Sequence, residues 1–136
     1  MNILFICKWN RFRSRLAEAY FNKINKNKNI IADSAGLFQG RYPLDSLQVK
    51  IGKEFNLDID GKPKAVSAEL LYKTDVIIIV ADDVPKEPFQ IDKKEVITFG
   101  IKDEVNGNEE NIRKIVRLIT DKVDSLILKL EEKNDN

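Results

Sequence analysis

The sequence predicts an α/β protein in which helices cover both faces of a parallel sheet. Apolar runs at 2–6 and 75–81 are typical of strands that are buried on both faces. Shorter strands are predicted at 30–34 and 95–99, and segments with helical periodicity lie among the strands. Alternating strands and helices form parallel sheets, and ligands bind beyond the carboxyl ends of such strands. The first of these ends is Cys7.

The first two helices are predicted from the spacing of their apolar residues and from their starting residues. The helix at 14–25 has apolar residues at near-helical intervals, and Ser14 can cap its start. The next helix runs from Pro43, which suits a first helical turn, to about Phe55.

Two further helices complete the predicted order of elements. A short helix starts near Ser67, and the longest helix spans 108–133, where apolar residues form one continuous stripe. No repeat, low-complexity segment or linker interrupts the chain, so residues 1–136 are predicted to form one domain. The connections are predicted as turns or loops at 26–29, 35–42, 60–64, 82–89 and 100–108.

The chain has 136 residues with one cysteine and no histidine. The absence of histidine excludes a Ser-His-Asp triad, a Cys-His pair and a histidine-based metal site. A single cysteine excludes an intramolecular disulfide, a zinc ribbon and a Cys-x-x-Cys redox pair. Any strong nucleophile is therefore Cys7, and we expect neither a metal nor another cofactor.

The 23 basic and 22 acidic residues give a net charge of +1, so no global field favours nucleic acid or a membrane. The longest apolar run, at 76–81, is far too short to span a bilayer. The amino-terminal stretch does not have the pattern of a signal peptide. We therefore expect a cytoplasmic protein that is a monomer or a weak dimer and binds neither membrane nor nucleic acid.

The segment from Cys7 to Ser14 has the features of an anion cradle. Five residues separate Cys7 from Arg13, so the intervening loop can turn its N–H groups inward at the start of a helix. The guanidinium of Arg13 can hold a tetrahedral oxyanion with two hydrogen bonds, and the positive field favours the Cys7 thiolate. Ser14 can hydrogen-bond the sulfur, and Asn10 is suited to a left-handed backbone position.

A lone cysteine at the end of a strand is most often a small core residue. The arginine and serine that follow Cys7, together with the strand-to-helix context, favour the functional interpretation instead.

The stretch ILFICKWNRFRSRLAEAYFNK at 3–23 resembles the opening of the low-molecular-weight protein tyrosine phosphatase family, whose fold is shared by one class of arsenate reductases. The family loop reads Cys-x-Gly-Asn-x-x-Arg-Ser-Pro and leads into an Ala-Glu-Ala helix. The likeness extends through later segments to about residue 130. It implies a three-layer sandwich with a four-stranded parallel sheet, the phosphatase I-like (Rossmann-like) fold. The residues that match the family loop and helix are Cys7, Asn10, Arg13, Ser14 and 17–19.

Several positions depart from the family pattern. Trp9 stands where the family has glycine, Arg15 replaces the proline, and Phe12 replaces a second loop cysteine. The family histidine that supports the loop asparagine has no counterpart, and the Asp-Pro-Tyr segment that carries the general acid has no intact match.

A general acid is still needed to protonate the leaving oxygen. By its order along the chain, Asp103 best matches the family acid, although the usual fate of a loop aspartate is a solvated turn. Asp82 and Asp83 are alternatives, and Asp82 aligns with a family aspartate that is usually structural. Glu104 is the fallback acid.

The rim of the site is predicted to combine aromatic and basic side chains. Trp9, Phe12, Phe38 and Tyr42 could form an aromatic wall, although aromatic residues more often belong to the core. The charges of Lys8, Arg11 and Arg15 could attract phosphorylated substrates, or form a solvated surface or a weak nucleic-acid contact. The predicted substrate-binding residues are Lys8, Trp9, Asn10, Arg11, Phe12 and Ser14.

These residues and the resemblance predict a phosphate-monoester hydrolase of the protein tyrosine phosphatase type. Cys7 would attack the phosphate of a phosphorylated protein or small phosphate monoester, Arg13 would hold its oxygens, and Asp103 would protonate the leaving group. Alternatives are an arsenate reductase that uses an external thiol and a non-catalytic phosphate or phosphopeptide-binding module. Either would still bind oxyanions such as phosphate or arsenate. A sugar-transport type of phosphocysteine carrier shares the layout, but the presence of Arg13 argues against it.

Overall fold

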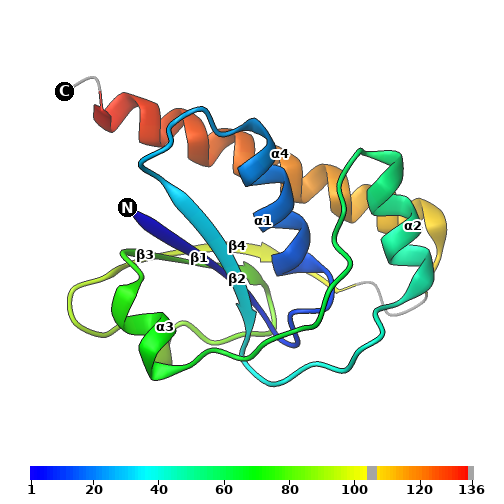
Figure 1. Cartoon of the computed structure of the whole chain (residues 1–136), viewed down its shortest axis with the longest axis horizontal. Helices are drawn as coiled ribbons and strands as arrows, with labels where there is room; N and C mark the ends of the chain where they lie inside the picture. Colours follow the sequence, from blue (N-terminus) through cyan, green and yellow to red (C-terminus); the bar gives the residue numbers. More distant parts are fainter. Residues whose placement is uncertain (104–106, 135–136) are drawn as a thin grey trace.

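The computed structural model describes residues 1–103 and 107–134 and contains the predicted parallel sheet. The strand order is β2-β1-β3-β4, and all neighbouring strands run parallel, so β1 lies inside the sheet (Figure 1). The fold predicted from the sequence is confirmed. The strands are β1 (Asn2–Cys7), β2 (Ile31–Gly36), β3 (Val76–Ala81) and β4 (Glu95–Ile101).

The helices form a layer on each side of this sheet. One face is covered by α1 (Arg13–Ile24), α2 (Ser46–Glu54) and α4 (Glu109–Asn134). The other face carries α3 (Ala68–Lys73) and the single-turn 3-10 helix η1 (Glu87–Phe89) (Figure 1). The carboxyl end of β1 therefore opens between two packed layers, as expected for a binding site in such a sheet.

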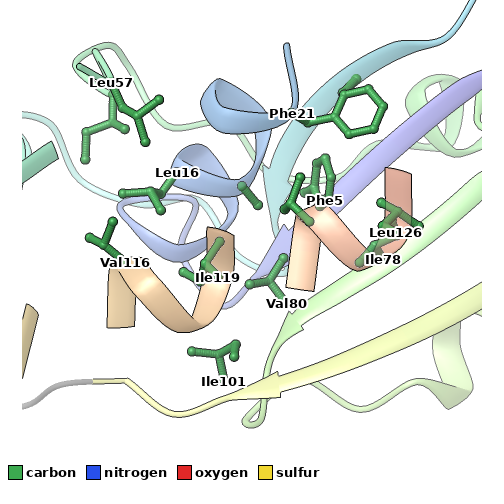
Figure 2. Packing of buried hydrophobic residues seen from close by; sticks show 14 of the residues in the cluster. Phe5, Leu16, Phe21, Leu57, Ile78, Val80, Ile101, Val116, Ile119 and Leu126 are labelled. Carbon is green, nitrogen blue, oxygen red and sulfur yellow. The ribbon is translucent and has the colours of Figure 1, made fainter. Parts of the chain in front are cut away.

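Alternate residues of β1 enter two separate hydrophobic cores. Ile3 and Phe5 join the larger cluster under α1 and α4, whereas Leu4 and Ile6 join the smaller cluster under α3. The ring of Phe5 is fully buried with its centroid 6.0 Å from that of Phe21 (Figure 2). Truncating such a side chain to alanine costs about 3–5 kcal/mol, so this packing fixes the strand that ends at the candidate site.

The helix α2 starts later than the sequence analysis predicted. Pro43 follows a cis peptide bond and precedes the helix, which begins at Ser46. Asp45 caps the helix, because its Oδ1 accepts a hydrogen bond from the backbone N of Gln48 at 2.9 Å. The prediction that Pro43 opens the helix was wrong because an aspartate cap satisfies an otherwise free N–H group, which proline cannot do.

The role predicted for Ser14 as a helix cap was also wrong. The helix α1 starts at Arg13, and Phe12 precedes it without a side-chain cap. The hydroxyl of Ser14 lies 3.0 Å from the Cys7 sulfur and accepts a hydrogen bond from Asn10. The side chain is therefore directed toward the loop and is not free to bond the helix N–H groups.

Two strands extend further than predicted, and both extensions serve the site. β2 continues to Gly36, which forms a parallel bridge with Ala65. This bridge brings the segment that precedes α3 beside the loop after β1. β4 continues to Ile101, which pairs with Ala81, so the backbone of Ile101 reaches the carboxyl end of the sheet.

Candidate active site

The loop between β1 and α1 is fixed from outside while its own N–H groups stay free. The backbone N of Leu37 donates to Cys7 O, and that of Phe38 donates to Lys8 O, each at 2.9 Å. A Cβ at Gly36 would lie 2.6–2.8 Å from neighbouring backbone atoms, including two of the loop, so only glycine allows this close approach. The N–H groups of residues 9–12 donate no hydrogen bond to any described residue. Such free groups before a helix form an anion-binding nest.

Asn10 holds the loop in shape from within. Its φ is 54°, the left-handed value that the sequence predicts, and its side chain is buried. Its Nδ2 donates to the hydroxyls of Ser14 at 2.8 Å and Ser34 at 3.0 Å. Its Oδ1 accepts from Lys64 N at 3.0 Å and from Arg15 Nη1 at 3.3 Å. The asparagine thus joins the loop to α1, to β2 and to the segment that follows α2.

Cys7 lies at the centre of this arrangement with its side chain only 3% exposed. Its sulfur is 3.0 Å from Ser14 Oγ. Because that oxygen already accepts a hydrogen bond from Asn10, the single hydroxyl hydrogen of Ser14 is free to point at the sulfur. The two side chains are therefore placed for a hydrogen bond from the Ser14 hydroxyl to the Cys7 sulfur.

Arg13 is buried but keeps one edge of its guanidinium open. Nη1 donates to Ile101 O at 2.8 Å, and Nη2 donates to the Asp83 carboxylate at 3.1 and 3.3 Å. Asp82 lies 3.8 Å from Nη1. No described residue accepts a hydrogen bond from Nε. Among the described residues, every side-chain nitrogen that is fully buried has a hydrogen-bond partner, so Nε of Arg13 must be accessible to solvent. The anchored fork therefore presents a free N–H edge.

The candidate catalytic residues meet at one small cavity of about 80 Å³. Its size suits a small anion. Larger cavities, such as one of about 480 Å³ between β4 and α4, contain no thiol. The site is therefore identified by the residues that line the cavity and not by its volume. The cavity is lined by Cys7, Trp9, Arg11, Phe12, Arg13, Gln48 and Asp103.

The structure places the three candidate acids differently. Asp103 lines the Cys7 cavity, whereas Asp82 and Asp83 lie against the guanidinium of Arg13. Glu104, the fallback acid, lies outside the described residues. Asp103 therefore remains the predicted acid, and the other two aspartates have an anchoring role in this structure.

Four of the predicted substrate-binding side chains are not at the rim. Phe12 lines the cavity but is only 4% exposed and packs in the larger core, so it belongs to the inner wall. Asn10 and Ser14 lie behind the sulfur and do not line the cavity. Lys8 is outside the lining as well, with Nζ 5.6 Å from the centroid of the Trp9 ring.

Gln48 is a lining residue that the sequence analysis missed. It comes from the first turn of α2 and is partly buried. A glutamine in a helix carries no sequence signal, because only the tertiary packing of α2 brings it to the cavity. Asp83 and Ile101 O were likewise not expected as anchors for Arg13, since they lie 70 and 88 residues away along the chain.

The mouth of the cavity is aromatic and basic. Trp9 is 43% exposed, and its ring centroid is 5.4 Å from that of Phe38. Arg11 donates to the carbonyls of Arg41 and Pro43 at 3.2 and 3.1 Å, which fixes its guanidinium. A second cavity of about 380 Å³ lies beside the first and is lined by Trp9, Arg11, Gln39 and Arg41. Tyr42 is half-exposed and lines neither cavity.

Glu18 ends the hydrogen-bonded chain that leads inward from Asn10. Ser34 accepts from Asn10 and donates to Glu18 Oε1 at 2.6 Å. Burial raises the pKa of Glu18 above its ordinary value of 4.5, and the hydrogen bond from Ser34 opposes that shift. The folded protein therefore holds this proton more tightly than the unfolded chain does.

This pKa shift predicts a pH-dependent gain in stability for Glu18→Gln. A raised pKa stabilises the fold fully below about 4.5, and this contribution is lost as the pH rises through the folded-state pKa. As the pH rises from about 4.5 through the folded-state pKa of Glu18, the free energy of unfolding of Glu18→Gln should therefore increase relative to that of the native protein. Urea unfolding at several pH values measures this difference. Glu131→Gln, at an exposed position, should show no such trend, and a constant difference for Glu18→Gln would contradict the prediction.

Within residues 1–103 and 107–134, no helix is long and apolar enough to cross a membrane. The same residues contain no group of three or more histidine, cysteine, aspartate or glutamate side chains that could hold a metal ion.

Comparisons with known proteins agree with the fold. Residues 2–136 match the family described as low molecular weight phosphotyrosine protein phosphatase. A low molecular weight protein tyrosine phosphatase from T. tengcongensis is 26% identical with a TM-score of 0.82, over 95% of this chain and 99% of that one. A comparison with curated proteins found no match.

Two other solved structures carry different activities on the same fold. An arsenate reductase from Archaeoglobus fulgidus is 26% identical with a TM-score of 0.74, over 92% of this chain and 98% of that one. The YwlE arginine phosphatase from Geobacillus stearothermophilus is 21% identical with a TM-score of 0.84, over 97% of this chain and 94% of that one. The resemblance read from the sequence is confirmed by the family match.

Proposed function

Because the chain belongs to the low molecular weight phosphotyrosine protein phosphatase family, we propose that it hydrolyses phosphate monoesters through a phosphocysteine on Cys7. One observation carries this proposal. Cys7, Arg13 and Asp103 line the same small cavity, beside backbone N–H groups that donate to no described residue. This set supplies a nucleophile, an oxyanion clamp and a proton donor.

In the first step the Cys7 thiolate attacks phosphorus in line with the leaving oxygen. The S–P bond forms as the P–O bond breaks, and Asp103 gives its proton to the departing oxygen. The open edge of Arg13 and the free N–H groups of the loop hold the three equatorial oxygens. Ser14 donates a hydrogen bond to the sulfur in the thiolate state.

In the second step water attacks the phosphocysteine, and Asp103 now accepts a proton from that water. The S–P bond breaks, the thiolate of Cys7 is regenerated, and inorganic phosphate leaves. The hydrogen bond from Ser14 stabilises the departing sulfur. The cycle therefore begins and ends with the same protonation states.

We propose phosphotyrosine, on a protein or as a small aryl phosphate, as the substrate class. The exposed ring of Trp9, which lines both cavities and is flanked by Phe38, can pack against a phenyl ring. Arg11 and Arg41 border the mouth and form no ion pair with a described residue. Their charges would repel the guanidinium of a phosphoarginine substrate, the class that the YwlE relative is named for.

A substrate panel tests this proposal. We expect hydrolysis of p-nitrophenyl phosphate and of phosphotyrosine, with competitive inhibition by phosphate, and slower hydrolysis of phosphoarginine. Faster turnover of phosphoarginine would overturn the proposed substrate class. Tight phosphate binding without turnover of any substrate would instead identify a binding module.

The likeness to an arsenate reductase supports one alternative function. Cys7 is the only cysteine, so arsenate bound in the cavity would have to be reduced by external thiols. In that reaction two thiols are oxidised to one disulfide while arsenate is reduced to arsenite and water is released. Arsenate-dependent oxidation of added glutathione, lost in Cys7→Ser, would favour this alternative. We propose the cytoplasm as the compartment, where the free thiol stays reduced, and a monomer or weak dimer as the assembly.

The basic rim predicts a preference for acidic sequences next to the phosphotyrosine. Arg41→Gln should lower kcat/KM about two- to fivefold for a phosphopeptide with acidic neighbours, because a surface charge pair contributes up to about 1 kcal/mol. The same variant should leave p-nitrophenyl phosphate hydrolysis unchanged. Arg117→Gln, which removes a remote arginine of α4, serves as the control. Equal loss on peptides with neutral neighbours would refute a role of charge at this position.

A further inference from the structure

The orientation of the Asn10 side-chain amide decides which way the hydrogen bonds around Cys7 run. An amide can present either its oxygen or its nitrogen to a given neighbour. With Nδ2 directed at Ser14, the serine hydroxyl accepts from Asn10 and keeps its hydrogen for the Cys7 sulfur. With the oxygen directed there instead, Ser14 would donate to Asn10 and leave the sulfur without that hydrogen bond.

Two groups on the far side of the amide fix this orientation, because both can only donate. The backbone N of Lys64 lies 3.0 Å from Asn10 Oδ1, and Nη1 of Arg15 lies 3.3 Å from the same atom. A flipped amide would place its NH₂ against two further donors. On the serine side, Ser14 can either donate or accept, whereas Ser34 gives its hydrogen to Glu18 and therefore favours the same orientation by accepting from Asn10.

Arg15 is itself held in place by the segment that follows α2. Its Nε donates to Ile59 O at 2.7 Å, and its Nη1 donates to Lys62 O at 3.2 Å. Gly61 has a φ of 150°, and a Cβ at this position would collide with Nη2 of Arg15. The guanidinium therefore fills a space that the glycine leaves open, with its fork bridging α1, the loop and this segment.

We propose that Arg15 is a positioning residue that keeps Asn10 turned so that Ser14 donates its hydrogen bond to Cys7. The side chain does not touch the cavity, so it acts through Asn10 and Ser14. Lys64 N provides a second donor to the same oxygen, and loss of Arg15 therefore weakens the orientation without abolishing it. This inference deepens the proposed function, but the state of the Cys7 sulfur can be measured without any turnover.

The test uses the pH dependence of Cys7 alkylation by iodoacetamide. Because only the thiolate reacts, the midpoint of the rate against pH reports how well the site stabilises it. Arg15→Met should move this midpoint upward, and kcat for p-nitrophenyl phosphate should fall about five- to tenfold, less than the full loss of one charge-assisted hydrogen bond because Lys64 N still orients Asn10. The KM should change little, because Arg13 and the loop N–H groups still bind phosphate. Arg117→Met, with an equally long side chain exposed on α4, should match the native protein.

Two further variants separate positioning from charge and from folding. Arg15→Lys keeps the charge but lacks the fork that reaches both Ile59 O and Asn10 Oδ1, so its midpoint should also rise. Gly61→Ala should displace the guanidinium and raise the midpoint with Arg15 still present. A native midpoint in Arg15→Met, or full recovery in Arg15→Lys, would overturn the proposal. Absence of turnover in the native protein would refute the proposed function and leave this measurement intact.

Discussion

Replacement of Cys7 by serine is expected to abolish hydrolysis of p-nitrophenyl phosphate, with a loss of kcat of at least about 10⁴-fold. Among the described residues, the side chain at this position contacts only the hydroxyl of Ser14, which is not a base that could remove the proton of a serine. Phosphate binding should survive, since Arg13 and the N–H groups of residues 9–12 are unchanged.

Steady-state kinetics and phosphate binding by calorimetry together check this expectation. Cys7→Ala provides a matched control, because it removes the nucleophile without introducing a hydroxyl. Both variants should bind phosphate at close to the native affinity. Turnover near the native rate in either variant would show that the sulfur is not the nucleophile.

Asp103→Asn is expected to produce the second large effect, a fall in kcat of about 10²–10⁴-fold. Asparagine has nearly the same shape but cannot transfer a proton to the leaving oxygen. The loss should be larger for phenyl phosphate than for p-nitrophenyl phosphate, because the nitro group makes the phenolate a better leaving group. Phosphate affinity should change little.

Other aspartate variants distinguish the acid from the anchors. Asp83→Asn should raise KM more than it lowers kcat, because Asp83 holds the guanidinium of Arg13. Asp92→Asn, at an exposed left-handed position that asparagine tolerates, should have no effect. An unchanged kcat in Asp103→Asn would move the acid to Asp82, Asp83 or Glu104.

Features that depend on local sequence could be predicted well. The buried run of β3 contains only apolar residues, and the 26-residue helix α4 was located to within one residue at each end. The cradle from Cys7 to Arg13 was also predictable, since a strand end, a short loop and a helix start are neighbours in the chain. The left-handed Asn10 follows from the tolerance of asparagine for that conformation.

Features that depend on distant segments could not be predicted. The anchors of Arg13 come from β4 and from the turn after β3, and only the register of the sheet brings them together. The second donor to Asn10 is a backbone N–H group at Lys64, which carries no side-chain signal. The cap predicted for Ser14 is wrong, whereas the predicted contact between its hydroxyl and the Cys7 sulfur is present at 3.0 Å.

Arg15 shows how a departure from the family pattern can be interpreted once the structure is known. The chain has no histidine that could support the loop asparagine, and it has an arginine in place of the family proline. In the structure this arginine contacts the same asparagine and is fixed by two backbone carbonyls. The two departures are therefore compatible with an ordered loop.

The most direct test of a phosphocysteine mechanism is to trap the intermediate. The native protein would be mixed with p-nitrophenyl phosphate, quenched within the first turnover by denaturant at alkaline pH, and digested for mass spectrometry. We predict one phosphoryl group on the peptide that contains Cys7, formed as the first equivalent of p-nitrophenol is released and absent from Cys7→Ala. Release of p-nitrophenol with no phosphoryl group on Cys7 would contradict the mechanism.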